Sequence, residues 1–159
     1  MEKIILVDHK KCTGCRLCEN VCSVQNEGVC NPQLARMKIV KYEWEGLQIP
    51  AICQQCEEAA CMAVCPMKAI SRDAELGCIR IHQDKCIGCK LCLAYCPFGA
   101  ITYNFARKTV SKCEYCDGDP VCVKFCETKA IQFIDATGAD MKKKRSLGAT
   151  ILKALTGRE

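Results

Sequence analysis

The sequence has few of the residues that fill an ordinary hydrophobic core. It contains four Phe, four Tyr and one Trp among 159 residues, and its apolar fraction of 50% counts eighteen cysteines. A core of aliphatic and aromatic side chains would be thin for a chain of this length. No apolar run is long enough to cross a bilayer. Residues 1–8 form a short apolar run ended by charge, without the cleavage site of a secretory signal. We therefore expect a soluble, cytoplasmic chain held together by its cysteines.

Sixteen of the eighteen cysteines form four groups of four. In the reducing interior of a cell such groups usually bind metal rather than form disulfides. The first and third groups share the spacing C-x2-C-x2-C-x3-C, the second has C-x2-C-x4-C-x3-C, and the fourth has one more residue in its middle gap. The groups are Cys12, Cys15, Cys18 and Cys22; Cys53, Cys56, Cys61 and Cys65; Cys86, Cys89, Cys92 and Cys96; and Cys113, Cys116, Cys122 and Cys126.

The spacing favours iron–sulfur clusters over zinc. A zinc site built on C-x2-C usually takes its second pair of ligands from well downstream. A third cysteine three residues after the second is typical of a loop that wraps three corners of a [4Fe–4S] cube, while the fourth cysteine ligates the other cluster of a pair. Proline follows this fourth cysteine at Cys65 and Cys96, as in bacterial ferredoxins. We predict four [4Fe–4S] clusters, with a zinc module as the alternative that elemental analysis would identify.

The groups also form an internal repeat. Residues 11–18 match residues 85–92, and residues 65–70 match residues 126–131, so two motif types are each used twice. Strand pairs are expected at residues 69–71 with 78–81 and at residues 37–42 with 47–50. Residues 4–8 and 131–134 are further candidate strands that would join the two ends of the chain.

These patterns predict an α+β fold of two nested bacterial-ferredoxin-like modules, with short helices and small antiparallel hairpins around the clusters. The outer module would comprise residues 1–52 and 104–135, the inner module residues 53–103, and a basic helical tail residues 136–159. Each module would hold two clusters.

The four-group order and the loop at residues 116–122 resemble the four-cluster electron-transfer subunits of molybdenum and tungsten oxidoreductases, such as formate dehydrogenase and dimethyl sulfoxide reductase. The resemblance covers residues 1 to about 135, and the compact size is most similar to the small subunits of tungsten aldehyde oxidoreductases or of tungsten benzoyl-CoA reductases. It implies four ligand sets, numbered here as sites. Site 1 is Cys12, Cys15, Cys18 and Cys126; site 2 is Cys113, Cys116, Cys122 and Cys22; site 3 is Cys53, Cys56, Cys61 and Cys96; site 4 is Cys86, Cys89, Cys92 and Cys65.

The expected function is electron relay without substrate turnover, so no catalytic residue is assigned. The resemblance implies a catalytic subunit with a tungsten or molybdenum pterin as the partner, and a flavin subunit or soluble ferredoxin as a further one. A free-standing polyferredoxin, or a relay subunit of a hydrogenase, carbon monoxide dehydrogenase or formate dehydrogenase complex, is the alternative. Four clusters of formal charge about −2 turn the net charge of +5 into about −3. The basic residues are therefore interpreted as counterions, not as a nucleic-acid surface.

Several residues outside the ligand sets carry weaker expectations. Acidic residues near group four would lower a cluster's potential, unless Lys112 and Lys124 partly offset them. The two leftover cysteines, Cys30 and Cys78, are expected to be small apolar residues. Trp44, in a predicted turn, would either dock a partner or cover its own hairpin. The tail would pack on a catalytic subunit, cap its own domain or lie on an anionic surface.

Overall fold

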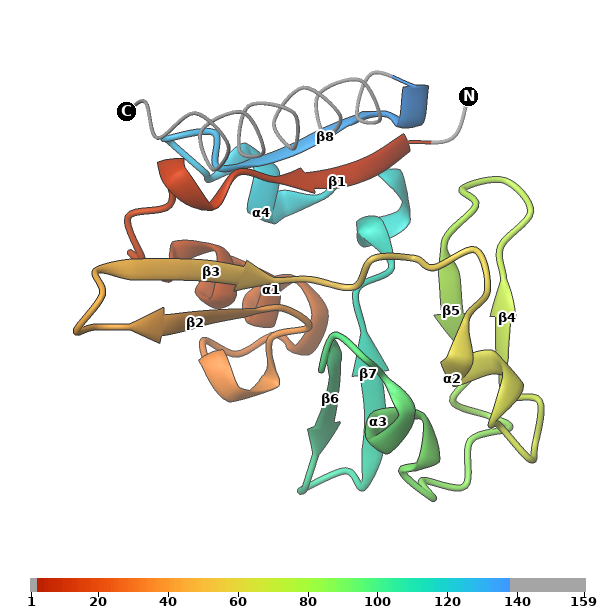
Figure 1. Ribbon diagram of the computed structural model, residues 1–159. Coiled ribbons are helices and arrows are strands. Elements are labelled where there is room, and N and C mark those ends of the chain that lie inside the picture. Colours follow the sequence, from red (N-terminus) through yellow and green to blue (C-terminus); the bar gives the residue numbers. More distant parts are fainter. Residues whose placement is uncertain (1–2, 138–159) are drawn as a thin grey trace.

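The computed structural model describes residues 3–137 and has an α+β, ferredoxin-like fold of short helices and four two-stranded antiparallel sheets (Figure 1). The strands are β1 (Lys3–Val7), β2 (Lys38–Tyr42), β3 (Leu47–Ala51), β4 (Ile70–Arg72), β5 (Ile79–Ile81), β6 (Ile101–Asn104), β7 (Thr109–Lys112) and β8 (Ile131–Asp135). The α-helices are α1 (Leu17–Glu27), α2 (Ala60–Ala63), α3 (Leu91–Tyr95) and α4 (Val121–Lys124), with 3-10 turns η1 (His9–Lys11), η2 (Pro32–Leu34) and η3 (Tyr115–Gly118).

The first and last strands pair with each other. β1 and β8 run antiparallel with Lys3 opposite Asp135 and Val7 opposite Ile131, side by side at the top of Figure 1. The ladder continues beyond the strands, since the backbone N–H of Asp8 donates to the carbonyl of Ala130 at 2.8 Å. The contact predicted between residues 4–8 and 131–134 is confirmed.

The remaining sheets are hairpins. β2 pairs with β3 and β4 pairs with β5, as the sequence predicts. The hairpin of β6 and β7 was not predicted; it pairs Ile101 with Lys112 and Asn104 with Thr109.

Three strands begin with the same local turn. After Cys65, Cys96 and Cys126 the chain turns through a residue with positive φ, namely Lys68 (49°), Gly99 (56°) and Lys129 (52°). The next residue in each case is a buried alanine, and β4, β6 or β8 starts immediately after it. The fourth cysteine of a group is thereby fixed at the start of a strand.

Two hydrophobic clusters form the core. One contains Ile5, Met37, Ile39 and Ile131 together with Cys18, Cys22, Cys78 and Cys122. The other contains Ile70, Ile79, Ile81, Ile101 and Val110 together with Cys92. Helix α1 contacts α4, and α2 contacts α3. Group one is therefore brought beside group four, and group two beside group three.

The hairpin of β6 and β7 crosses the predicted module boundary between residues 103 and 104. Val110 of β7 packs in the same cluster as Ile70 and Ile101, so this hairpin is packed with the inner part of the chain. The division into two modules stays a proposal, and we place the end of the inner one after β7.

The residues outside the four cysteine groups that carried expectations differ in their burial. Cys78 is fully buried in the core, as expected, but Cys30 is exposed and so is not a core residue. Trp44 is 99% exposed, which excludes the expectation that it covers its own hairpin. The predicted tail lies outside the described residues, apart from residues 136–137. No helix within residues 3–137 is both long and apolar enough to span a membrane.

Candidate cluster-binding sites

The two C-x2-C-x2-C loops have the same backbone conformation. Gly14 and Gly88 both have φ of 68°, and the residues that precede α1 and α3, Arg16 and Lys90, have φ of 62° and 65°. The sequence repeat is therefore also a structural repeat. Left-handed turns on both sides of the second cysteine curl the loop, so that three cysteines approach one space.

Gly88→Ala is expected to disturb its loop more than Gly14→Ala. The left-handed conformation alone costs a non-glycine residue roughly 1–2 kcal/mol. A Cβ at Gly88 would lie 2.8 Å from the backbone carbonyl oxygen of Lys108, whereas at Gly14 it would meet the flexible side chain of Gln48. On heating, we expect Gly88→Ala to lose its cluster absorbance at a distinctly lower temperature than Gly14→Ala does. Gly46→Ala, with φ of 63° and no atom within 4 Å, is the control for conformation alone. An equal shift in Gly46→Ala and Gly88→Ala would contradict the argument.

Three of the four cysteine sets surround cavities of nearly equal size. The empty volume is about 350 Å³ at site 4, 350 Å³ at site 2 and 360 Å³ at site 3. Each cavity is lined by all four cysteines of its set, including the one from the distant group: Cys65 at site 4, Cys22 at site 2 and Cys96 at site 3. Similar volumes with similar donors are what copies of one cofactor require.

The site 1 cysteines lie around the core cluster that contains Cys18. Cys12 and Cys126 pack against this cluster, while Cys15 is exposed. Because β8 pairs with β1, Cys126 is carried by the turn that leads into β8 to the same end of the molecule as Cys12.

The four sites follow one another in a row. Burial is the largest cause of the raised pKa values of Cys122, Cys113 and Cys92, and in each case a thiol of a neighbouring site raises the pKa further. Three pairs of thiols from different sites interact electrostatically in this way: Cys18 with Cys122, Cys113 with Cys53, and Cys92 with Cys61. Site 1 therefore adjoins site 2, site 2 adjoins site 3, and site 3 adjoins site 4.

The donors fit a [4Fe–4S] cluster chemically. Within residues 3–137 no three His, Cys, Asp or Glu side chains form a site for one metal ion, whereas the cysteine sets enclose space. Burial raises the pKa of Cys18 to about 12 and that of Cys92 to about 11. Iron binds these cysteines as thiolates, so cluster assembly must displace their protons.

Backbone amides also point at the ligand sulfurs. The amide of Ala69 donates to Cys65 Sγ at 3.3 Å, that of Ala100 to Cys96 Sγ at 3.4 Å and that of Arg36 to Cys22 Sγ at 3.3 Å. Hydrogen bonds to sulfur are one of the means by which a protein sets a cluster's potential.

The acidic residues near site 2 are ion-paired, which corrects part of the sequence expectation. Each has a basic partner: Glu114 with Arg36 at 3.0 Å, Asp117 with Arg80 at 2.7 Å, and Asp119 with Lys124. Lys124 offsets an acid as expected, but Lys112 does not. It is buried and lines the site 3 cavity.

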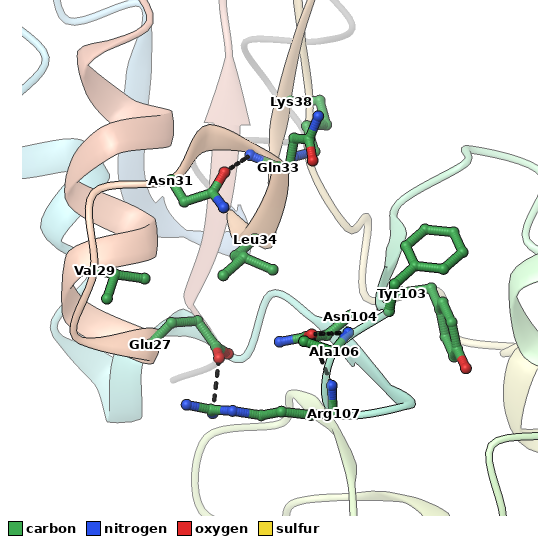
Figure 2. Close-up of a pocket in the computed structure, with 11 residues that line it drawn as sticks. Glu27, Val29, Asn31, Gln33, Leu34, Lys38, Tyr103, Asn104, Ala106 and Arg107 are labelled. Carbon is green, nitrogen blue, oxygen red and sulfur yellow. Dashed lines mark hydrogen bonds and ion pairs between the residues drawn. The ribbon is translucent and has the colours of Figure 1, made fainter.

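Another groove lies outside the cysteine sets. It has about 1210 Å³ of empty space, and its lining residues include no cysteine. Figure 2 shows Glu27 of α1 reaching to Arg107, with an ion pair of 2.9 Å, and the side chain of Asn104 accepting hydrogen bonds from the amides of Ala106 and Arg107. These contacts tie the turn of the β6–β7 hairpin to the outer part of the chain.

Two buried polar residues beside the sites were not predicted as such: the sequence analysis gives Gln55 no role and expects Lys112 only to offset nearby acids. Gln55 lies between Cys53 and Cys56 with φ of 48°, and it donates to the carbonyl of Cys113 at 2.7 Å. No local pattern marks such residues. Only their position beside a cysteine could have drawn attention to them.

Comparison with known proteins places the chain among iron–sulfur proteins. A family described as "4Fe-4S dicluster domain" matches residues 44–136, and one described as "4Fe-4S binding domain" matches residues 9–25. The putative electron transport protein YsaA of Escherichia coli K12 is 40% identical over 148 residues, covering 85% of this chain and 91% of the relative. The polyferredoxin-like subunit of aliphatic sulfonate oxidoreductase of Pyrococcus furiosus is 35% identical over 122 residues, covering 77% and 70%.

More distant similarities extend this picture. Formate hydrogenlyase subunit 2 of Escherichia coli K12 is 29% identical over 182 residues, covering 91% of this chain and 88% of the relative. A chain of the active site complex of benzoyl coenzyme A reductase, solved with benzoyl-CoA, has a TM-score of 0.51 at 20% identity, covering 98% of this chain and 97% of its own. At that identity the likeness concerns the fold.

Proposed function

The chain belongs to the 4Fe-4S dicluster domain family, and from this premise we propose that it is an electron-relay subunit that holds four [4Fe–4S] clusters in a row. It is an electron-transfer protein that binds several [4Fe–4S] clusters and is not itself an enzyme. When bound, each cluster takes up and releases one electron. The finer proposals concern the number of clusters, their ligands and the partner.

The observation that carries the proposal is the order of the sites together with the exposure of their cysteines. Of the sixteen proposed ligands, Cys15 and Cys89 are exposed, and the other fourteen are buried or partly buried. These two belong to sites 1 and 4, the two ends of the row. Each end site thus has one exposed cysteine, at which electrons can be exchanged with other proteins, whereas neither middle site has one.

The surface around Cys89 has the character of a docking site. Ile87, in the loop that carries Cys89, is 63% exposed, and Leu91, the first residue of α3, is 41% exposed. Lys85 and Lys90 beside them are exposed as well. Apolar side chains with a basic rim favour a partner whose surface is apolar and acidic.

We propose a tungsten or molybdenum pterin subunit as one partner, specifically that of a tungsten aldehyde oxidoreductase, and a flavin subunit or soluble ferredoxin at the other end. Support comes from the relative in Pyrococcus furiosus, which is named as a subunit of an oxidoreductase. The alternative is a free-standing carrier or a hydrogenase-type relay, supported by the names of the two relatives in Escherichia coli. The cytoplasmic location expected from the sequence stays a prediction.

Elemental analysis of the anaerobically purified chain tests the cluster number. Four clusters correspond to about sixteen iron and about sixteen acid-labile sulfide per chain. Stoichiometric zinc without sulfide would end the proposal. Purification from the native host then tests the partner: we expect a pterin–metal subunit to copurify, whereas a monomer on sizing would favour the free-standing carrier.

A further inference from the structure

Lys112 is a fully buried lysine, with 0% of its surface exposed. It is the last residue of β7, and its ammonium Nζ donates to three oxygens: Gln55 Oε1 at 3.0 Å, the carbonyl of Cys113 at 3.0 Å, and the carbonyl of Ile79. All three donors of an ammonium group are thereby used. The geometry fixes a positive charge in the interior.

This charge has no acidic partner among residues 3–137. Its hydrogen-bond partners are neutral oxygens, unlike those of Glu19, the other buried charged side chain, which pairs with Arg16 at 3.4 Å. Burying an unpaired charge costs several kcal/mol. A nearby negative charge that is supplied by something other than a carboxylate would offset this cost.

Lys112 lies where two cluster sites meet. It lines the cavity of site 3 and precedes Cys113 of site 2 in the chain. Gln55, which accepts from Lys112, sits in the site 3 loop and donates to the Cys113 carbonyl at 2.7 Å. The Lys112–Gln55 pair therefore joins the inner and outer halves of the row of sites.

We propose that Lys112 is a built-in counterion that raises the reduction potential of the cluster at site 3, so that this site is where an electron resides within the relay. The inference rests on the proposed function. A thiolate-bound cluster is negative, and reduction makes it more so. A fixed positive charge in a low-dielectric interior stabilises the reduced form more than the oxidised form. Site 3, whose cavity Lys112 lines, is thus favoured over sites 1 and 4, which have no buried lysine among residues 3–137.

The test is an EPR-monitored redox titration of the complete, cluster-loaded chain carrying Lys112→Met or Lys112→Gln. We expect one midpoint potential to fall by at least about 59 mV, which corresponds to a tenfold change in the equilibrium constant of a one-electron reduction. The affected signal should be the one that Cys61→Ser removes. Lys112→Arg, which keeps the charge, should stay closer to the original midpoint. Lys124→Met removes a lysine charge near Cys122 and Cys126 that is 55% exposed, and should shift no midpoint comparably.

Iron and sulfide content is measured on every variant, so that loss of clusters is distinguished from a shift in potential. Gln55→Glu provides a second route, because a carboxylate beside Lys112 neutralises it while the lysine stays in place; we expect the same midpoint to fall. Unchanged midpoints in fully loaded Lys112→Met or Gln55→Glu protein would overturn the inference. So would a shift in Lys112→Arg as large as that in Lys112→Met, which would indicate packing rather than charge. A failure to find four clusters in the unmodified chain would instead count against the proposed function.

Discussion

Removal of iron with a chelator, under anaerobic and reducing conditions, is expected to unfold the chain. Without iron–sulfur clusters the hydrophobic core offers little to hold the fold together. Cysteines make up a substantial part of its larger group of buried residues, namely Cys18, Cys22, Cys78 and Cys122. Each sheet has two strands, and an isolated two-stranded hairpin is at best marginally stable in water. The helices have 4 to 11 residues, shorter than a helix needs to persist alone.

We therefore expect essentially all of the free energy of unfolding, typically about 5–15 kcal/mol for a domain, to depend on the clusters. Far-UV circular dichroism and amide-proton NMR dispersion before and after chelation measure the loss. The same reducing buffer without chelator is the control, and reconstitution with iron and sulfide should restore the signals. An iron-free chain that still unfolded cooperatively would show that the side chains suffice.

Cys65→Ser is expected to remove the cluster at site 4, not the one at site 3. Cys65 lies in the second group of the sequence, yet it lines the same cavity as Cys86, Cys89 and Cys92. The loss of one ligand from a four-cysteine set should abolish or convert one cluster, with iron falling by up to about four per chain. EPR spectra identify which signal disappears, using Cys89→Ser as the reference for site 4 and Cys56→Ser as the reference for site 3.

The reciprocal variant strengthens this test. Cys96→Ser should remove the same signal as Cys56→Ser, because Cys96 lines the site 3 cavity with Cys53, Cys56 and Cys61. Cys30→Ser is the matched control, since Cys30 is exposed and belongs to no set; its iron content should not change. If Cys65→Ser matched Cys56→Ser instead, the exchange of ligands between groups would be wrong.

The β6–β7 hairpin was not predicted, although the motif that precedes β4 is repeated before β6. Residues 96–101 read CPFGAI and residues 65–70 read CPMKAI, and both turn through a positive φ into a strand. The motif that predicts β4 therefore also predicts β6. The signal for this hairpin is therefore present in the sequence.

Lys112 could not have been placed from sequence. Lysine is usually exposed, and the nearest charged residue along the chain is Glu114, so the natural expectation is a surface ion pair near group four. The acids instead pair with Arg36, Arg80 and Lys124. Which lysine faces inward depends on the path of β7 between two cysteine loops, and no local pattern encodes that path.

The sequence by itself determined the cofactor chemistry and the strand pairing of the ends. Ligand spacing is a local property, because three cysteines within seven to ten residues fix the space that they can surround, and [4Fe–4S] clusters match that spacing. The tertiary structure alone decided the order of the sites, the exposure of Cys15 and Cys89 at the two ends, and the burial of Lys112 between sites 2 and 3. These features depend on contacts between residues far apart in the chain, and the energies that set them, burial and charge, depend on what the fold brings together.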